Sequence, residues 1–372
     1  MSMRHYESDM LRKLNENNET VRVGAATVLV KPSPSEPRPG YVDRMLWEQI
    51  KNIPWELVVE EEKNRTKDIA KAVQKMRDTS GGFNENINSV EIHTKYEEFN
   101  ADGNTVGLWR YYPRQSQNRK DRSALVFIHG GGWISGSVYT VENSCRYIAE
   151  KADAVVFSVD YSLAPEKPYP NGLNDCYCAL CHVAEHAAEY GIDPNRIAIC
   201  GDSAGGNLTA ALALMARDKG FPKVALQVLI YPVIMFGDKL PEDYAWSVDL
   251  LGIAPEQEKQ VTPLAQLGRP DPVEQDFMFI VYHGESGVPE DPYMSPAFAK
   301  SHEGLPPALL ISGEFDGLRL HTEYYAGLLT KAGVPNKCIR YRGLSHAFID
   351  FIGSLPQAED LCNEIADAML KM

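Results

Sequence analysis

A tight turn between a strand and a helix is the feature that most constrains the fold of this chain. The segment Gly201-Asp202-Ser203-Ala204-Gly205 has the pattern G-x-S-x-G, and it follows an apolar run, residues 196–200, with the length of a buried strand. Residues 207–219 then have helical periodicity. We therefore expect Ser203 on a sharp strand-to-helix turn, with the N–H groups of the helix start beneath its hydroxyl. This geometry is typical of a serine nucleophile.

A second glycine motif lies upstream of the serine. Residues 126–133 read as a strand that runs into Gly130, Gly131 and Gly132. Glycines at such a position can turn backbone N–H groups inward, as an oxyanion hole requires. A flexible turn is the alternative, whereas a phosphate cradle fits poorly because neither the Lys-Ser/Thr of a P-loop nor the dinucleotide spacing follows.

A serine nucleophile needs a base and a group that orients the base. Asp316 follows a late apolar strand at residues 308–312, and His346 lies in the loop after the last predicted strand. The order Ser, Asp, His is the one expected of an α/β-hydrolase. We expect His346 to remove the proton of Ser203, and Asp316 to fix the imidazole tautomer.

Each of these assignments has a competitor. Glu314 is an alternative orienter, but it lies closer to the end of its strand than Asp316. His129 is the rival base, although a histidine just before the glycines is expected to brace that loop. Asp202 neighbours the nucleophile and should face away from the site, in a structural role.

Strands and helices alternate from about residue 88. Eight short apolar or β-branched segments predict strands: residues 90–99, 106–112, 124–128, 154–159, 196–200, 225–231, 308–312 and 337–341. Helical segments separate most of them, which predicts a mostly parallel eight-stranded sheet with helices on both faces. Residues 236–293, rich in Pro, Asp and Glu, are too long for a simple connection and are expected to form a lid insertion.

The first 87 residues differ from the rest. Residues 1–40 are polar and end in closely spaced prolines, which predicts a linker or a draped arm without regular structure. Residues 41–80 contain two amphipathic helical stretches separated by a charged segment at residues 60–63. We therefore divide the chain into an arm with cap helices (1–87) and a catalytic domain (88–372).

Composition limits the function classes. The net charge of −14 and the lack of a basic run argue against a nucleic-acid partner. No stretch approaches the roughly 20 apolar residues that span a bilayer, and the start of the chain lacks the apolar core of a signal peptide. We expect a soluble cytoplasmic protein without a membrane partner. Cys176, Cys178 and Cys181 lie near His182 and His186, and this cluster suggests a metal site as one hypothesis. The positions of the cysteines on a helix favour packing against the sheet instead.

The motifs together resemble a known family. Residues 129–133, 160–166 and 201–206 and the loops of Asp316 and His346 are similar, in family order, to the hormone-sensitive-lipase-like esterases, the bacterial family IV carboxylesterases of the α/β-hydrolase fold. The resemblance covers roughly residues 88–372. It implies a triad of Ser203, Asp316 and His346. It also implies an oxyanion hole of the backbone N–H groups of Gly131, Gly132 and Ala204, and a helical cap over the site.

Some positions depart from the family pattern. Ser162 stands where the family usually has Arg, residues 317–321 replace Pro-Leu-Arg-Asp-Glu with Gly-Leu-Arg-Leu-His, and Ala347 replaces a common Gly. None of these changes removes a catalytic group. The loss of acidic residues after Asp316 is expected to alter the rigidity of that loop or the pKa values near it.

The resemblance implies a serine carboxylesterase that hydrolyses short-chain acyl esters, a small-molecule ester being its partner. Such acyl transfer requires no metal and no organic cofactor. Trp133, Tyr161 and Phe348 are candidates to wall a small apolar pocket, with ordinary core packing as the alternative for each. The oligomeric state is left open, with a homodimer as one option.

Two other functions stay open. An amidase or peptidase would use the same triad, because amide and ester cleavage share the acyl-enzyme. Plant gibberellin receptors resemble the same family and bind a small ligand without catalysis, but they have lost the catalytic histidine. The presence of His346 weakens the receptor reading.

Overall fold

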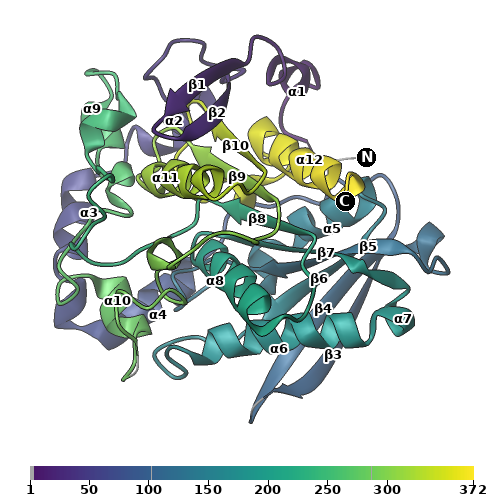
Figure 1. Cartoon of the computed structure of the whole chain (residues 1–372). Coiled ribbons are helices and arrows are strands. Elements are labelled where there is room, and N and C mark those ends of the chain that lie inside the picture. Colours follow the sequence, from purple (N-terminus) through teal and green to yellow (C-terminus); the bar gives the residue numbers. More distant parts are fainter. Residues whose placement is uncertain (1–3, 102, 286) are drawn as a thin grey trace.

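A twisted sheet forms the centre of the molecule (Figure 1). The structure, a computed structural model, describes residues 4–101, 103–285 and 287–372. Within these ranges the sheet has ten strands in the order β1-β2-β10-β9-β8-β7-β5-β6-β4-β3. The strands are β1 (Glu19–Val23), β2 (Ala26–Lys31), β3 (Ile92–Ala101), β4 (Asn104–Pro113), β5 (Arg122–Ile128), β6 (Val155–Asp160), β7 (Ile192–Asp202), β8 (Leu226–Ile230), β9 (Ala308–Gly313) and β10 (Asn336–Tyr341).

The direction of the strands follows from their connections. The neighbouring pairs from β2 through β10, β9, β8, β7 and β5 to β6 are parallel. The hairpins β1–β2 and β3–β4, and the pair β4–β6, are antiparallel. All eight predicted strands are present, so the predicted mostly parallel sheet is confirmed. The count of eight strands was too low by the two strands of the first hairpin.

That hairpin corrects the prediction of a draped arm over residues 1–40. β2 pairs in parallel with β10, with Val28 opposite Cys338 and Val30 opposite Arg340. Val28 is fully buried and Val30 is 3% exposed. β2 is mostly apolar, and its side chains are buried except for the exposed Thr27 and the half-buried Leu29, as expected of a strand inside a sheet. Gly24, at φ +55°, turns the chain between the two strands. Residues 32–43, which contain the prolines, form a stretch without helix or strand between β2 and α2 (Arg44–Ile50).

Helices cover both faces of the sheet. Ile148 of α5 and Leu361 of α12 belong to one buried apolar cluster, and Leu173 of α6, Leu208 of α8 and Tyr325 of α11 belong to the other. The helices on the first face are α1 (Asp9–Lys13), α5 (Glu142–Lys151) and α12 (Pro356–Leu370). Those on the second face are α6 (Asn171–Glu185), α7 (Ala187–Tyr190), α8 (Ala204–Lys219) and α11 (Leu318–Lys331). One-turn helices connect them: η2 (Arg114–Ser116), η3 (Val138–Thr140), η6 (Pro296–Phe298) and η7 (Phe348–Phe351).

Two separate parts of the chain contact each other, and together we call them the cap. The first contains α2 (Arg44–Ile50), α3 (Trp55–Glu62), η1 (Arg65–Lys67) and α4 (Ile69–Thr79). The second, the insertion between β8 and β9, contains η4 (Val248–Leu251), α9 (Glu258–Val261), η5 (Leu264–Gln266) and α10 (Phe277–Tyr282). The two parts lie side by side in Figure 1, and Lys259 of the insertion pairs with Glu56 of α3 at 2.7 Å. Helix α3 runs into the charged segment that we expected to separate two helices.

Candidate active site

The nucleophile turn is built by the end of β7 and the start of α8. Ser203 lies between them with φ 55° and ψ −118°, a conformation that is strained for a residue with a side chain. Its backbone N–H donates to the carbonyl of Ile230 at 2.9 Å, which holds the turn against β8. Gly205 lets the turn lie close to the end of β5 as well, since a Cβ at that position would lie 2.0 Å from the carbonyl oxygen of Ile128.

The structure brings Ser203, His346 and Asp316 together. The Oγ of Ser203 lies 2.8 Å from Nε2 of His346, and Nδ1 of His346 lies 2.7 Å from Oδ2 of Asp316. Asp316 is fully buried, and its Oδ1 accepts the backbone N–H of Leu318 at 2.9 Å. These bonds orient the carboxylate so that His346 can carry its proton on Nδ1 and present Nε2 to the serine hydroxyl.

The electrostatics of the site favour a protonatable His346. Burial lowers the pKa of His346, but the charge and the hydrogen bond of Asp316, with a further contribution from Asp202, outweigh burial and raise the pKa above its ordinary value. An imidazolium that forms when Ser203 loses its proton is therefore stabilised where it arises.

The glycine loop lies beside the nucleophile turn. A Cβ on Gly205 would come within 2.6 Å of the carbonyl oxygen of His129, so the two segments are in direct contact. Gly131 has φ +119° and Gly132 has φ +63°, and a Cβ on Gly131 would lie 2.1 Å from the carbonyl oxygen of Ser135. Only glycine fits at position 131, and the segment that leads into this loop lies against Gly205, in the first turn of α8.

Two residues that competed for catalytic roles support this loop instead. Oδ1 of Asp202 accepts the N–H of Gly130 at 2.8 Å, which ties the glycine loop to the nucleophile turn. Nδ1 of His129 lies 2.7 Å from the carbonyl oxygen of Gly130, and burial lowers the pKa of His129 to about 4. His129 is thus a neutral ring that donates to the loop, as expected of a brace.

The competing carboxylate, Glu314, braces another loop. Its Oε2 accepts the backbone N–H of Gly343 at 2.9 Å, three residues before His346. His321, one of the residues that differ from the family pattern, makes contacts through both ring nitrogens. Its Nδ1 accepts the N–H of Ile234 at 3.2 Å, and its Nε2 lies 3.2 Å from the carbonyl oxygen of Gly268. His321 thus joins α11 to the cap insertion.

A family model described as the alpha/beta hydrolase fold matches residues 125–350. The chain belongs to the α/β-hydrolase family. It is 34% identical to Esterase LipI of Mycobacterium tuberculosis over 259 residues, 69% of this chain and 75% of that protein. It is 33% identical to an arylesterase of Saccharolobus solfataricus over 237 residues, 62% of this chain and 70% of that protein.

A solved structure extends the likeness over most of this α/β-hydrolase. The hyperthermophilic esterase of Pyrobaculum calidifontis matches with a TM-score of 0.67 and 30% identity, covering 89% of this chain and 99% of the other. The resemblance to the hormone-sensitive-lipase-like esterases, drawn from the motifs, is confirmed by these matches.

The three aromatic residues named as pocket candidates have different surroundings in this α/β-hydrolase. Trp133 is 2% exposed and stacks on Tyr282 of the cap insertion, with ring centroids 4.5 Å apart. Tyr161 stacks on His129 and donates its hydroxyl proton to the His129 carbonyl at 2.9 Å. Phe348 packs on Tyr231 and Tyr341 within the core. Of these three aromatic residues, Trp133 is the one whose stacking partner lies in the cap.

The structure adds neighbours of the site that the sequence did not indicate. The ring of Tyr231, directly after β8, lies 4.6 Å from that of His346. Met76 of α4 and Met278 of α10 face Gly132, since a Cβ on this glycine would lie 3.4 Å from Cε of Met76 and 2.7 Å from Sδ of Met278. A tyrosine at a strand end is a weak signal, and no pattern links the two methionines before the cap is folded.

The cysteine and histidine cluster on α6 is used in packing. Cys176 is fully buried, His182 stacks on Phe99 with ring centroids 4.5 Å apart, and Nδ1 of His186 lies 2.9 Å from the His182 carbonyl oxygen. Among the described residues, no group of three or more His, Cys, Asp or Glu side chains is placed to hold a metal ion. Over the same ranges, every helix falls short of the length or apolar character that a membrane span requires.

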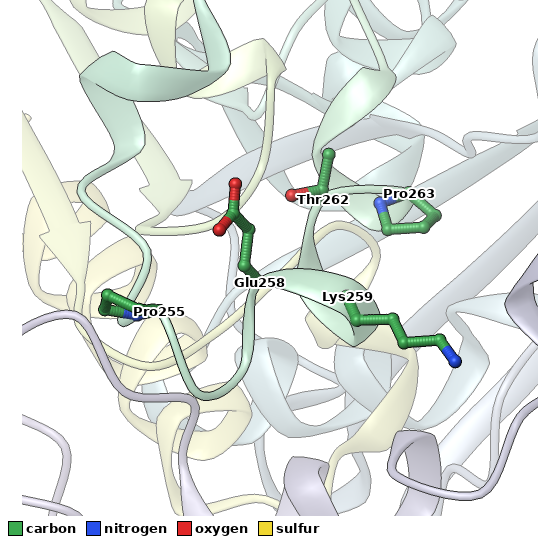
Figure 2. A pocket seen from close by; sticks show the side chains of 5 residues that line it. All are labelled: Pro255, Glu258, Lys259, Thr262 and Pro263. Carbon is green, nitrogen blue, oxygen red and sulfur yellow. The ribbon is translucent and has the colours of Figure 1, made fainter.

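Two depressions lie elsewhere on the surface. One lies on the insertion and has a volume of about 490 Å³. Figure 2 shows the side chains that line it: Pro255, Glu258, Lys259, Thr262 and Pro263. A second, of about 380 Å³, lies between the β1–β2 turn and α11, where the cations are already paired, Arg340 with Glu323 and Lys331 with Asp243. Neither lining includes a residue of the Ser203 site.

Proposed function

We propose that this α/β-hydrolase is a serine carboxylesterase that forms an acyl-enzyme on Ser203. The observation that carries the proposal is the continuous chain of short hydrogen bonds from Ser203 Oγ through His346 to a fully buried Asp316. A serine hydroxyl is a weak nucleophile by itself, and it needs a base at hydrogen-bond distance whose protonated form is stabilised. His346 meets both requirements.

The first half of the reaction breaks the ester. His346 Nε2 accepts the proton of Ser203 as Oγ attacks the carbonyl carbon, and a tetrahedral intermediate with a negative oxygen forms. The imidazolium then donates its proton to the leaving alcohol oxygen, which leaves the acyl group on Ser203. Asp316 stays ionised throughout and holds the imidazole in place.

The negative oxygen needs hydrogen-bond donors that are already in position. We assign this role to the backbone N–H groups of Gly131, Gly132 and Ala204, because the glycine loop adjoins the start of α8 beside Ser203. The start of α8 adds the positive end of its dipole. Asp202 and His129 fix the loop from behind, so the donors need not reorganise during the reaction.

Water completes the cycle. His346 removes a proton from a water molecule as its oxygen attacks the carbonyl carbon of the acyl-enzyme. The second tetrahedral intermediate then breaks its bond to Ser203 Oγ, the imidazolium returns the proton to that oxygen, and the carboxylic acid leaves. This route needs no metal ion and no organic cofactor, because every proton moves between the substrate, water and the three side chains.

The class of the enzyme, a carboxylic ester hydrolase, is the one predicted from the sequence, and the esterases among its relatives confirm it. For the substrate we propose short-chain acyl esters. Met76 and Met278 come from the two parts of the cap and lie against Gly132. We propose that the next residue, Trp133, which stacks on Tyr282 of the cap, forms a wall of the acyl pocket. A pocket closed by side chains this near the oxyanion loop favours a small acyl group.

Initial rates on nitrophenyl acetate, butyrate and octanoate and on a nitroanilide test this proposal. We expect turnover of the acetate and butyrate esters, weaker turnover of the octanoate and little of the anilide. Ser203→Ala should remain folded, because its side chain is small, and should lose all four activities. Preferred hydrolysis of the anilide would favour the amidase alternative, and binding of esters without turnover would favour the receptor alternative.

A further inference from the structure

One arginine of the cap reaches both loops that support the glycine motif. Arg77 lies in the last turn of α4, and its Nε donates to the carbonyl of Ile134 at 3.0 Å. Its Nη2 donates to the carbonyl of Ala164 at 3.1 Å. Nη1 and Nη2 also donate to the two carboxylate oxygens of Glu166, at 2.8 Å and 2.6 Å. A single guanidinium therefore joins the cap to two segments of the catalytic domain.

The carbonyl of Ile134 belongs to the turn that shapes the oxyanion loop. The N–H groups of Ile134 and Ser135 both donate to the carbonyl of Gly131, at 3.2 Å and 2.9 Å. The N–H of Ala164 donates to the carbonyl of Trp133 at 2.9 Å, so the loop after β6 is bonded to the same turn. The position of the Gly131 and Gly132 backbone thus depends on a small network, and Arg77 binds two of its carbonyl groups.

We propose that Arg77 is a positioning residue that fixes the oxyanion loop when the cap is docked, so that the cap takes part in stabilising the transition state. This inference rests on the proposed function, because it needs Gly131 and Gly132 to act as the oxyanion donors. A flexible pair of glycines with positive φ can adopt many conformations, and donors that must reorganise lose most of their catalytic effect.

The chemistry of the side chain fits this role. A guanidinium has donors in a rigid planar fork and can bond two carbonyls and a carboxylate at once, which the single ammonium group of lysine cannot reproduce. Arg77 lowers the pKa of Glu166 to about 2 through their hydrogen bond, so the pair stays charged over the working range of pH. The Glu166 side chain is 61% exposed, and this pair alone should add little to stability.

In the part of the chain that the structure describes, the other cap contacts of the loop are apolar. Tyr282 stacks on Trp133, and Met76 and Met278 lie against Gly132. Such contacts exclude water and bind the acyl group, but they hold no backbone carbonyl in a defined direction. Within the described ranges, the hydrogen bond of Arg77 to Ile134 is therefore the directional tie between cap and loop.

The test compares Arg77→Ala and Arg77→Lys with Lys75→Ala, an exposed position on the same helix whose ammonium pairs with Glu61. For each we would measure kcat and KM on nitrophenyl butyrate. We would also measure the affinity for a trifluoromethyl ketone, which forms an oxyanion on the serine, and for the corresponding methyl ether, which does not. Removal of one oxyanion donor costs about 10²–10³ in turnover. A loosened loop keeps its donors, so kcat should fall by less than this, by about tenfold or somewhat more.

We expect Arg77→Ala to lower kcat and the affinity for the trifluoromethyl ketone together, while KM and the affinity for the ether change by less than about threefold. Arg77→Lys should recover only part of the loss, and millimolar methylguanidinium should restore kcat of Arg77→Ala. Values for Lys75→Ala should equal those of the wild type.

Labelling of Ser203 by an organophosphonate separates the two hypotheses. If the wild type is not labelled at Ser203, the proposed function fails and this inference with it. If the wild type is labelled but Arg77→Ala matches Lys75→Ala in kcat and in ketone affinity, the role of Arg77 alone is overturned. A uniform loss in all parameters without rescue by methylguanidinium would also overturn it, and Arg77→Lys provides this readout if Arg77→Ala does not fold.

Discussion

Exchange of one buried carboxyl for an amide tests how His346 is oriented. In the wild type, Oδ1 of Asp316 accepts the N–H of Leu318 at 2.9 Å, and Oδ2 accepts the proton on Nδ1 of His346 at 2.7 Å. In Asp316→Asn, the amide oxygen keeps the bond to Leu318, so the NH₂ group faces His346. The imidazole must then accept at Nδ1 and carry its proton on Nε2, facing Ser203, where it cannot act as a base.

The expected loss is about 10⁴ in kcat, or about 5.4 kcal/mol of transition-state stabilisation. The charge-assisted hydrogen bond from His346 to Asp316 accounts for about 1.5–3 kcal/mol of this. The remainder comes from the wrong tautomer and from the missing negative charge beside the imidazolium. Loss of the carboxylate also removes two of the contributions that raise the pKa of His346.

Glu314→Gln is the matched control, since it makes the same chemical change two residues away. Its amide oxygen can still accept the N–H of Gly343, which the carboxylate binds at 2.9 Å, so kcat should fall by less than about fivefold. Steady-state rates on nitrophenyl butyrate, with circular dichroism to show that both variants fold, decide the matter. Equal losses in the two variants, or a larger loss in Glu314→Gln, would refute the assignment of Asp316.

Three further results are expected. Because Asp316 raises the pKa of His346 above its ordinary value of 6.5, kcat/KM should rise with pH through a midpoint above 6.5, and a midpoint at or below that value would contradict the assignment. Burial raises the pKa of Asp202 from 3.8 to about 6. Between pH 3.8 and pH 6 the folded state therefore binds more protons than the unfolded state, and the free energy of unfolding falls as the pH rises. Asp202→Asn should therefore be more stable than the wild type to urea at pH 8 but not at pH 3.5, and an equal difference at both pH values would count against this cause. Val28→Ala removes two buried carbons from β2 and should lower the free energy of unfolding by about 2 kcal/mol. Thr27 is exposed on the same strand, so Thr27→Ala should lower it by less than about 0.5 kcal/mol. Equal losses would mean that the hairpin is not part of the sheet.

The catalytic fold was predictable because its signals are local. Each of the eight predicted strands is a short apolar run, and a buried parallel strand has that composition whatever its partners are. The hairpin β1–β2 was missed because Glu19, Thr20 and Arg22 make β1 polar, and its pairing with β10 joins residues at opposite ends of the chain. The apolar, β-branched run of β2 and the glycine at position 24 are the local signals that indicate this hairpin.

The candidate site also has contacts that the sequence predicts and contacts that it does not predict. The contacts of Ser203, Asp316 and His346 follow from three strand ends that a parallel sheet must place at one edge, so their spacing along the chain predicts them. The contacts of Met278 and Arg77 with the oxyanion loop depend on how the cap docks, and docking arises from many small contacts rather than from a pattern within either segment. The role of Asp202 was predictable, because a side chain next to the nucleophile must point away from it.

Mass spectrometry of the intact protein after reaction with an organophosphonate tests the nucleophile most directly. The reagent forms a stable bond to an activated serine, and proteolysis then locates the modified residue. We predict one adduct per chain, on Ser203, formed in step with the loss of esterase activity, much more slowly in His346→Ala and not at all in Ser203→Ala. Complete inactivation with the adduct on another residue, or esterase activity that persists in Ser203→Ala, would contradict the mechanism.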